Sequence, residues 1–229
     1  MPTTVGYRSV QGLATAILVV MALYVIVEAC NVVNLVVAIS VMKGSAAGDV
    51  VPKDELAAIT MRTGAIALLT VLFMLAAGVL FCFFMPRANR NASAFGSLMT
   101  ISPGWTVGWW FIPVASLWMP YQAMREIWQG SDPDPTVPMV NVPAPAVMKW
   151  WWGLYLVHSF SGFAPLLAGM GDQQGEAFIT SSTIKIATTA VSIVAALLAA
   201  GTVRAVARRQ DARQKQAPTP RAATAGAAL

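Results

Sequence analysis

The sequence predicts an all-α integral membrane protein with four transmembrane helices and one further segment, rich in Trp and Pro, that is interfacial or re-entrant. Three observations predict this class. Hydrophobic residues make up 57% of the 229 residues and charged residues only 11%, whereas soluble domains have about 25% charged residues. The mean hydropathy is +0.63. The apolar residues gather in long runs, and about 20 such residues are needed to cross the hydrocarbon core.

The apolar runs predict helices over about residues 13–41, 64–85, 149–170 and 179–203. The first run is too long for the 7–15-residue core of a signal peptide, so we interpret it as a membrane helix. Pro86 and Arg87 are expected to end the second helix, and a cluster of basic residues after Val203 is expected to end the fourth. Residues 1–12 and 204–229 are then cytoplasmic. The latter stretch is basic at first, and its last part is expected to be disordered.

Residues 104–129 are apolar, but four helix-breaking residues argue against a fifth crossing. The 17 residues from Gly104 to Pro120 would form a helix of about 26 Å, shorter than the hydrocarbon core of about 30 Å. All eight Trp of the chain lie between positions 105 and 152, and Trp prefers the level of the lipid headgroups. We therefore expect this segment to lie in one membrane interface. The breaking residues are Gly104, Gly108, Pro113 and Pro120.

The last part of this segment has the spacing of an amphipathic helix. Leu117, Tyr121, Met124 and Trp128 recur at three or four residues and form an apolar stripe. Such a helix lies in the plane of the interface. Its polar face is either a solvated surface or a surface for a cytoplasmic protein partner. That face consists of Gln122, Arg125, Glu126 and Gln129.

The Lys and Arg residues indicate an orientation. With four spans and a cytoplasmic N-terminus, eleven of the 15 lie in the cytoplasm and four outside, which agrees with the excess of positive charge on cytoplasmic loops. A five-span arrangement with the N-terminus outside also places eleven inside, so this count does not decide between them. Both arrangements put the C-terminal tail in the cytoplasm, and the expected location is the plasma membrane. The basic residues of the C-terminal tail are expected to attract anionic lipids of the inner leaflet.

Glu28 is the acidic residue within a predicted membrane helix, where a carboxylate costs at least about 2.5 kcal/mol. Asn31 and Asn34 follow at helical spacing and share its face. His158 lies near the centre of the third run, at a depth similar to that of Glu28. Lys185 lies nearer the outer surface, and its side chain is expected to reach down toward the same stripe. Two interpretations stay open. One is a Glu28–His158 pair that transfers a proton or binds a cation or polar solute; the other is a hydrogen bond between helices that fixes their register.

A run of about thirty residues, from Gly104 to Pro133, combines the Trp, the two prolines and the amphipathic helix. This run resembles the signature of a bacterial membrane family, the domain of unknown function 4328. The resemblance implies a membrane location and about four helices, and it implies no activity, because the family has none assigned. Members commonly have Asn where this chain has Ser116. The matching positions are Trp109, Phe111, Pro113, Pro120, Tyr121, Met124, Glu126 and Trp128, then Ser131, Asp132 and Pro133.

The sequence contains no nucleophile elbow, phosphate loop, zinc-ligand spacing or dinucleotide fingerprint. We therefore predict a non-enzymatic protein without cofactor or metal, and the basic residues beside apolar runs argue against nucleic acid. The first hypothesis is a scaffold that binds a protein partner through the cytoplasmic Trp/Pro segment. The alternative is a small transporter or proton-linked channel at the Glu28 stripe; a third hypothesis is an enzyme acting on lipid headgroups. Separately, the small residues Thr188, Ser192, Ala196 and Ala200 recur every four residues and serve either internal helix packing or a homo-oligomer contact. The candidate interfacial residues are Trp109, Pro113, Trp118, Pro120, Tyr121, Gln122, Arg125, Glu126 and Trp128.

Overall fold

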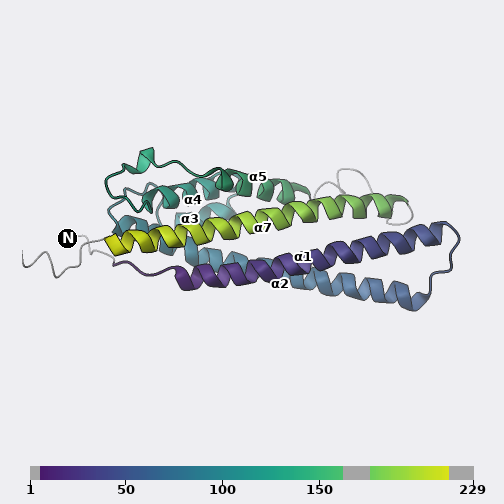
Figure 1. Cartoon of the computed structure of the whole chain (residues 1–229). Helices are drawn as coiled ribbons and strands as arrows, with labels where there is room; N and C mark the ends of the chain where they lie inside the picture. Colours follow the sequence, from purple (N-terminus) through teal and green to yellow (C-terminus); the bar gives the residue numbers. More distant parts are fainter. Residues whose placement is uncertain (1–5, 162–175, 217–229) are drawn as a thin grey trace, which may run out of the picture. The chain divides into compact units, whose positions relative to one another are not determined.

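The computed structural model describes residues 6–161 and 176–216, and all the regular elements in these ranges are helices (Figure 1). Three of the helices are long and apolar enough to cross a membrane: α1 (Gln11–Ala46), α2 (Lys53–Ala94) and α7 (Glu176–Gln216). α5 (Ala146–Ser161) has 16 residues and a length of about 24 Å. The described residues therefore contain three candidate spans where the sequence predicted four. The predicted helix 149–170 runs beyond α5 into positions 162–170, which lie outside the described residues.

The second long helix does not end where the sequence predicted. Pro86 lies inside α2, and the helix continues to Ala94. Ala88, Asn89 and Ala92 on this extension are fully buried, so tertiary packing outweighs the backbone hydrogen bond that proline removes. The chain leaves the helix at Gly96, which has φ 88°, and the N–H of Ser97 donates to the carbonyl of Ala92 at 3.2 Å. Glycine is favoured at this left-handed position because it has no Cβ.

The chain divides into two compact units, and the three long helices contribute to both. We call residues 17–79 and 147–201 the bundle unit. We call residues 1–16, 80–146 and 202–229 the motif unit, because it contains the Trp- and Pro-rich segment.

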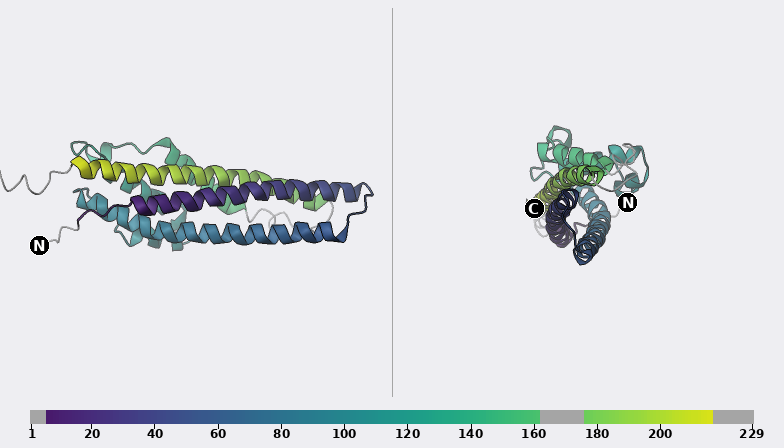
Figure 2. Two further views of the ribbon diagram at one scale, coloured as in Figure 1. Left: turned by 60° about the horizontal axis from the view of Figure 1, so that its bottom comes forward. Right: turned by 90° about the vertical axis from the view of Figure 1, so that its right-hand side faces the viewer.

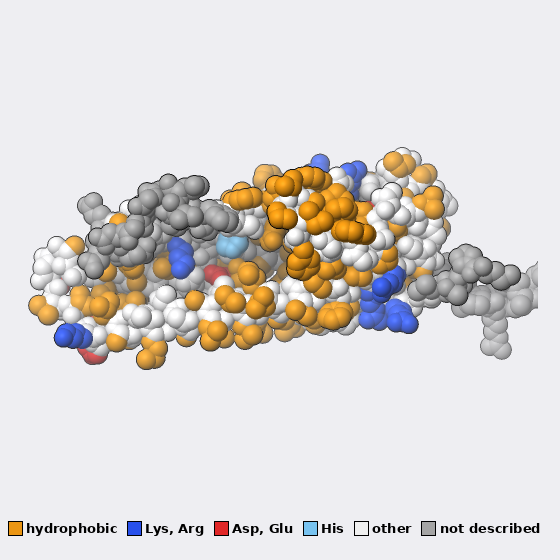
Figure 3. Space-filling model, turned by 180° about the vertical axis from the view of Figure 1, so that it is seen from behind, with side chains coloured by type: hydrophobic (Ala, Val, Ile, Leu, Met, Phe, Trp, Pro, Cys, Tyr) orange, Lys and Arg blue, Asp and Glu red, His pale blue; other side chains and the backbone are white. Residues whose placement is uncertain are grey.

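In the bundle unit, α1 and α2 form an antiparallel hairpin (Figures 1 and 2). Most large apolar side chains of this hairpin face outward. Leu68, Leu72 and Leu75 are 71%, 56% and 59% exposed, and the most apolar 18-residue window of α2 has no buried residue. Figure 3 shows hydrophobic side chains over much of one face of the described chain. A water-soluble protein rarely exposes such continuous apolar surface, so the three long helices are compatible with a membrane protein.

In the motif unit, residues 104–130 form a chain of short helices. These are α3 (Trp105–Gly108), the 3₁₀ helices η1 (Trp109–Phe111) and η2 (Ala115–Leu117), and α4 (Met119–Gly130). Pro113 falls between η1 and η2, and Pro120 is in the first turn of α4, where its missing N–H costs no hydrogen bond. The unit is completed by η3 (Met139–Asn141) and by the last turns of α7, so residues 204–216 are helical.

Candidate functional site

The predicted polar stripe of α1 meets a polar face of α2 in the bundle unit. Glu28 is only 4% exposed. Its Oε1 accepts a hydrogen bond from the hydroxyl of Thr70 at 2.9 Å, and its Oε2 accepts one from the side-chain amide of Asn31 at 3.1 Å. Asn34 donates to the hydroxyl of Thr63 at 2.9 Å and accepts from Nε of Arg62 at 3.3 Å. The stripe therefore links the two helices by hydrogen bonds.

His158 and Lys185 are not part of this network. His158 is half-buried in α5, and its Nδ1 has no hydrogen-bond partner among the described residues. Lys185 is exposed on α7. Within the described ranges, the side-chain partners of Glu28 are Thr70 and Asn31. The structure thus brings Glu28 and Asn31 together and does not join either one to His158 or Lys185.

The partners on α2 were missed in the sequence analysis. Thr63 and Thr70 are seven residues apart, which places them on one face of a helix two turns apart. This seven-residue spacing is the signal in the sequence that could have identified them, but two threonines in an apolar helix are not specific for a polar contact. A further contact comes from α7, where Ser192 forms a hydrogen bond with the hydroxyl of Tyr24.

The motif unit is built around a buried amide, Gln210, which is fully inaccessible. Its Nε2 donates to the carbonyl of Ala88 at 2.8 Å and to the hydroxyl of Ser131 at 2.9 Å. Its Oε1 accepts from Asn91 at 2.8 Å, and Asn91 also bonds the backbone N–H and carbonyl of Arg8. One network therefore joins Arg8, α2, the end of α4 and α7 within this unit.

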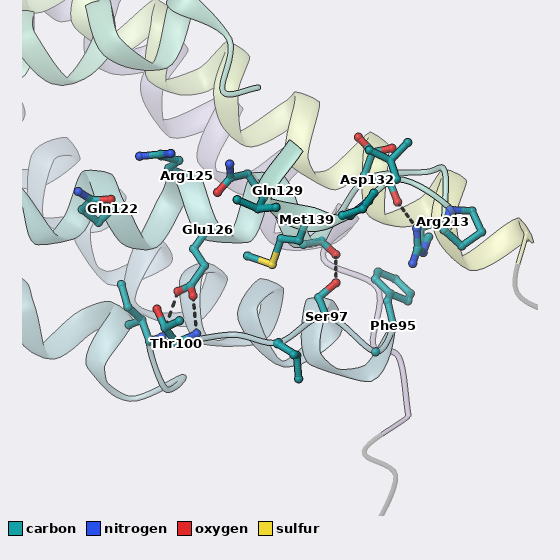
Figure 4. Close-up of a pocket in the computed structure, with 18 of the residues that line it drawn as sticks. Phe95, Ser97, Thr100, Gln122, Arg125, Glu126, Gln129, Asp132, Met139 and Arg213 are labelled. Carbon is teal, nitrogen blue, oxygen red and sulfur yellow. Dashed lines mark hydrogen bonds between the residues drawn. The ribbon is translucent and has the colours of Figure 1, made fainter. Parts of the chain in front are cut away.

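The buried face of α4 includes Met124 of the predicted stripe, but its other fully buried members were not part of that stripe. Ala123, Met124 and Ile127 are fully buried, whereas Gln122 and Arg125 are exposed. Glu126, predicted to lie on the polar face, is 8% exposed and accepts hydrogen bonds from the backbone N–H groups of Thr100 and Ile101. Figure 4 shows this side chain directed from α4 toward Thr100. Glu126 is therefore not a solvated surface residue, and it holds the loop after α2 in place.

The other motif residues divide into packed and exposed ones. Nε1 of Trp128 donates to the carbonyl of Pro143 at 3.1 Å, and the guanidinium of Arg209 lies 4.1 Å from the centre of its ring. Trp109 packs on Trp105 with 4.6 Å between ring centres. Trp118 is 47% exposed. Among the remaining predicted residues, Pro120 is buried, Tyr121 is half-buried and Pro113 is exposed.

A groove of about 930 Å³ opens beside α4, entirely within the motif unit (Figure 4). The loop after α2 forms one wall, one side of α4 forms another, and the segment 132–140 with Arg213 of α7 completes it. Asp132 at its edge is ion-paired with Arg209, and its carbonyl accepts from Nη1 of Arg213 at 2.7 Å. The lining of the groove includes Leu98, Trp118, Gln122, Arg125, Val140 and Arg213.

The comparisons with known proteins identify the family. The family model described as Domain of unknown function (DUF4328) matches residues 47–208. The chain belongs to this family. The match confirms the resemblance seen in the Trp- and Pro-rich run, and it covers α4 and most of the groove. No curated protein and no solved structure matches the chain.

In the motif unit of this DUF4328 protein, two side chains have pKa values shifted from their ordinary values. Burial, together with the hydrogen bond to Asp211 and the charge of that carboxylate, raises the pKa of Tyr7 to about 12. Hydrogen bonds from the hydroxyl and the backbone N–H of Thr136 lower the pKa of Asp134. Neither group lines the groove. Across the described ranges, no group of three His, Cys, Asp or Glu is placed to hold a metal ion.

Proposed function

We propose that this DUF4328 protein is a non-enzymatic, multi-pass protein of the plasma membrane that binds a protein partner through the groove of the motif unit. The proposal rests on a contrast between the buried residues that hold the groove together, which we call its frame, and the exposed residues that line its walls. Gln210 and Glu126 hold the frame through buried hydrogen bonds. Leu98 and Val140 on the walls are 90% and 83% exposed. Large apolar side chains exposed on a rigid frame are typical of interaction sites.

The charges around the groove favour an acidic segment as the partner. Both carboxylates of the lining are already satisfied within the unit, Glu126 by backbone N–H groups and Asp132 by Arg209. Arg125 is exposed and has no ion pair among the described residues, and Arg213 adds a second guanidinium. Arginine and Trp are enriched where binding energy concentrates. An acidic peptide with one apolar anchor complements Arg125, Arg213 and Trp118.

The proposed topology keeps four spans, with α5 in one of them and with both termini in the cytoplasm. The division of residues 105–130 into short helices supports four spans over five, whereas the distribution of Lys and Arg, eleven against four of the 15 in the chain, supports the cytoplasmic C-terminal end in either arrangement. The groove then opens to the cytoplasm. The basic end of α7, which includes Arg204, Arg208 and Lys215, contributes about 1 kcal/mol per residue toward anionic lipids near the membrane surface.

Site-specific photo-crosslinking in cells tests the partner site. A crosslinking amino acid at Val140 is expected to give a protein adduct that Arg125→Glu abolishes, because the reversed charge repels an acidic segment. Arg90→Glu is the matched control, since Arg90 is also an exposed arginine of the motif unit that does not line the groove. An adduct that persists in Arg125→Glu, or an adduct with lipid alone, would contradict the proposal.

A second candidate function is a small transporter or channel, and the burial of Glu28 is the observation that favours it. An ionisable residue inside a membrane helix usually has a functional role. Purified protein in proteoliposomes is then expected to make them permeable to protons or small cations, and Glu28→Gln is expected to remove the permeability. Vesicles that stay as tight as protein-free ones would exclude this function.

A further inference from the structure

The carboxylate of Glu28 lies between α1 and α2 with two neutral hydrogen-bond donors and no cation. It is 4% exposed, and its bonds to Thr70 and Asn31 are 2.9 and 3.1 Å long. No ion pair to it exists in the described part of the chain. Neutral donors compensate part of the desolvation of a carboxylate, but its net charge stays uncompensated. We propose that Glu28, Asn31 and Thr70 bind a monovalent alkali cation between these two helices.

Neither Arg62 nor Lys185 forms an ion pair with Glu28 among the described residues. Arg62 donates to Asn34, which is six residues along α1 from Glu28, or about 9 Å along the helix axis. Lys185 is exposed. In this proposal a bound cation balances the charge of an ionised Glu28.

The available ligands are hard oxygens, which suit alkali cations better than soft metals. Both carboxylate oxygens of Glu28 and the hydroxyl of Thr70 meet at this point. Asn31 donates through Nδ2, which leaves its Oδ1 to coordinate an ion. A single carboxylate favours a single positive charge, because a divalent cation would leave one charge uncompensated in a medium of low dielectric constant.

This site is independent of partner binding in the motif unit. It names the ligand class for the second candidate function, and it does not require transport, because a bound cation also fixes the α1–α2 contact. Loss of crosslinking at Val140 and loss of cation binding at Glu28 are therefore separate outcomes.

Thermal unfolding of the purified protein in detergent tests the cation site. Sodium chloride is expected to raise the unfolding temperature above that in choline chloride at equal ionic strength, because an ion that binds only the folded state stabilises it. The rise is expected to vanish in Glu28→Gln and to shrink in Thr70→Val, while Thr70→Ser keeps it. Thr60→Val is the matched control, because the Thr60 hydroxyl donates to the carbonyl of Leu56 in its own helix.

Chemical labelling provides a second readout that does not depend on the variants folding. Dicyclohexylcarbodiimide adds the O–H of a protonated carboxyl across its C=N bond, and the adduct rearranges to a stable N-acylurea. A sodium-bound carboxylate carries no proton, so sodium is expected to slow labelling of the Glu28 peptide several-fold relative to choline. The proposal is overturned if sodium, potassium and lithium change neither the unfolding temperature nor the labelling rate, or if Thr70→Val behaves like Thr60→Val.

Discussion

The bundle unit and the motif unit treat apolar surface in opposite ways. On α2 in the bundle unit, Leu72 and its neighbours point outward and the polar residues point inward to Glu28. In the motif unit, Met124 and Ile127 are fully buried and the helix α4 exposes Gln122 and Arg125. The first pattern suits lipid as the solvent and the second suits water. The comparison is compatible with one chain that meets two solvents, with each of the three long helices contributing residues to both units.

The same substitution in the two units gives the sharpest test of this contrast. Leu72→Arg is expected to cost roughly 3 kcal/mol of membrane insertion, since a charged side chain would face lipid. Leu98→Arg is the matched control, because Leu98 is even more exposed but lies in the motif unit, where water accommodates the charge. The fraction inserted in a membrane-integration assay measures both. Equal losses in the two variants would remove the distinction between the units.

The buried amide of the motif unit is expected to have the next largest effect. Gln210→Leu removes hydrogen bonds to Asn91, Ala88 and Ser131, at about 1 kcal/mol each or roughly 3 kcal/mol together. Five of the eight Trp lie in this unit, and the other three, Trp150, Trp151 and Trp152, lie in the bundle unit, so tryptophan fluorescence during unfolding reports mainly on the motif unit. Gln214→Ala, an exposed position on the same helix, is expected to change little. A Gln210→Leu protein as stable as wild type would contradict the network.

Glu126→Gln is expected to have a smaller and more local effect. The carboxylate oxygens accept hydrogen bonds from the N–H groups of Thr100 and Ile101. The Gln side chain has one neutral oxygen, so it keeps only one of these two bonds, and the protein loses about 1–2 kcal/mol of stability. Hydrogen exchange at these two amides is expected to accelerate, as followed by mass spectrometry of the peptide that contains them. Glu55→Gln, an exposed residue at the start of α2, serves as the control. Unchanged protection at Thr100 would show that Glu126 does not hold this loop.

The smallest expected effect is a change in alkaline stability at Tyr7. Its pKa is raised from 10.0 to about 12 in the folded protein, so the neutral phenol is favoured by folding. Its contribution to the free energy of unfolding is complete below pH 10 and is lost as the pH rises through about 12. Tyr7→Phe is expected to lack this part of the pH dependence. Unfolding temperatures measured across the alkaline range would contradict the assignment if the two proteins declined in parallel.

The sequence predicted the helical class because long apolar runs and scarce charge leave few alternatives. It also identified the face of α1 that carries Glu28 and Asn31, since helical spacing alone places them together. It did not identify Thr70, because pairing between two helices depends on their packing and not on local pattern. The continuation of α2 past Pro86 was missed for a similar reason. Local propensity predicts a break there, and burial of residues such as Ala88 and Ala92 overrides it.

The groove was beyond the reach of sequence analysis for a related physical reason. Its frame depends on Gln210, which lies in a stretch expected to be a basic tail, and on Asn91, which lies beyond the expected end of a helix. Both are polar residues without a motif, and only tertiary packing brings their amides within 2.8 Å. The amphipathic pattern after Pro120 did indicate a helix, but it assigned Glu126 to the wrong environment because carboxylates are rarely buried.

The side of the membrane from which two groove residues are accessible tests the proposed topology and the groove most directly. Leu98 and Val140 line one groove, yet the segment between them contains the whole Trp/Pro run. In a protein with Cys30 and Cys82 replaced by serine, cysteines placed at these two positions are expected to react with an impermeant maleimide only from the cytoplasmic side. Labelling of the two positions from opposite sides of the membrane would mean that residues 104–129 cross it, and the groove would not exist.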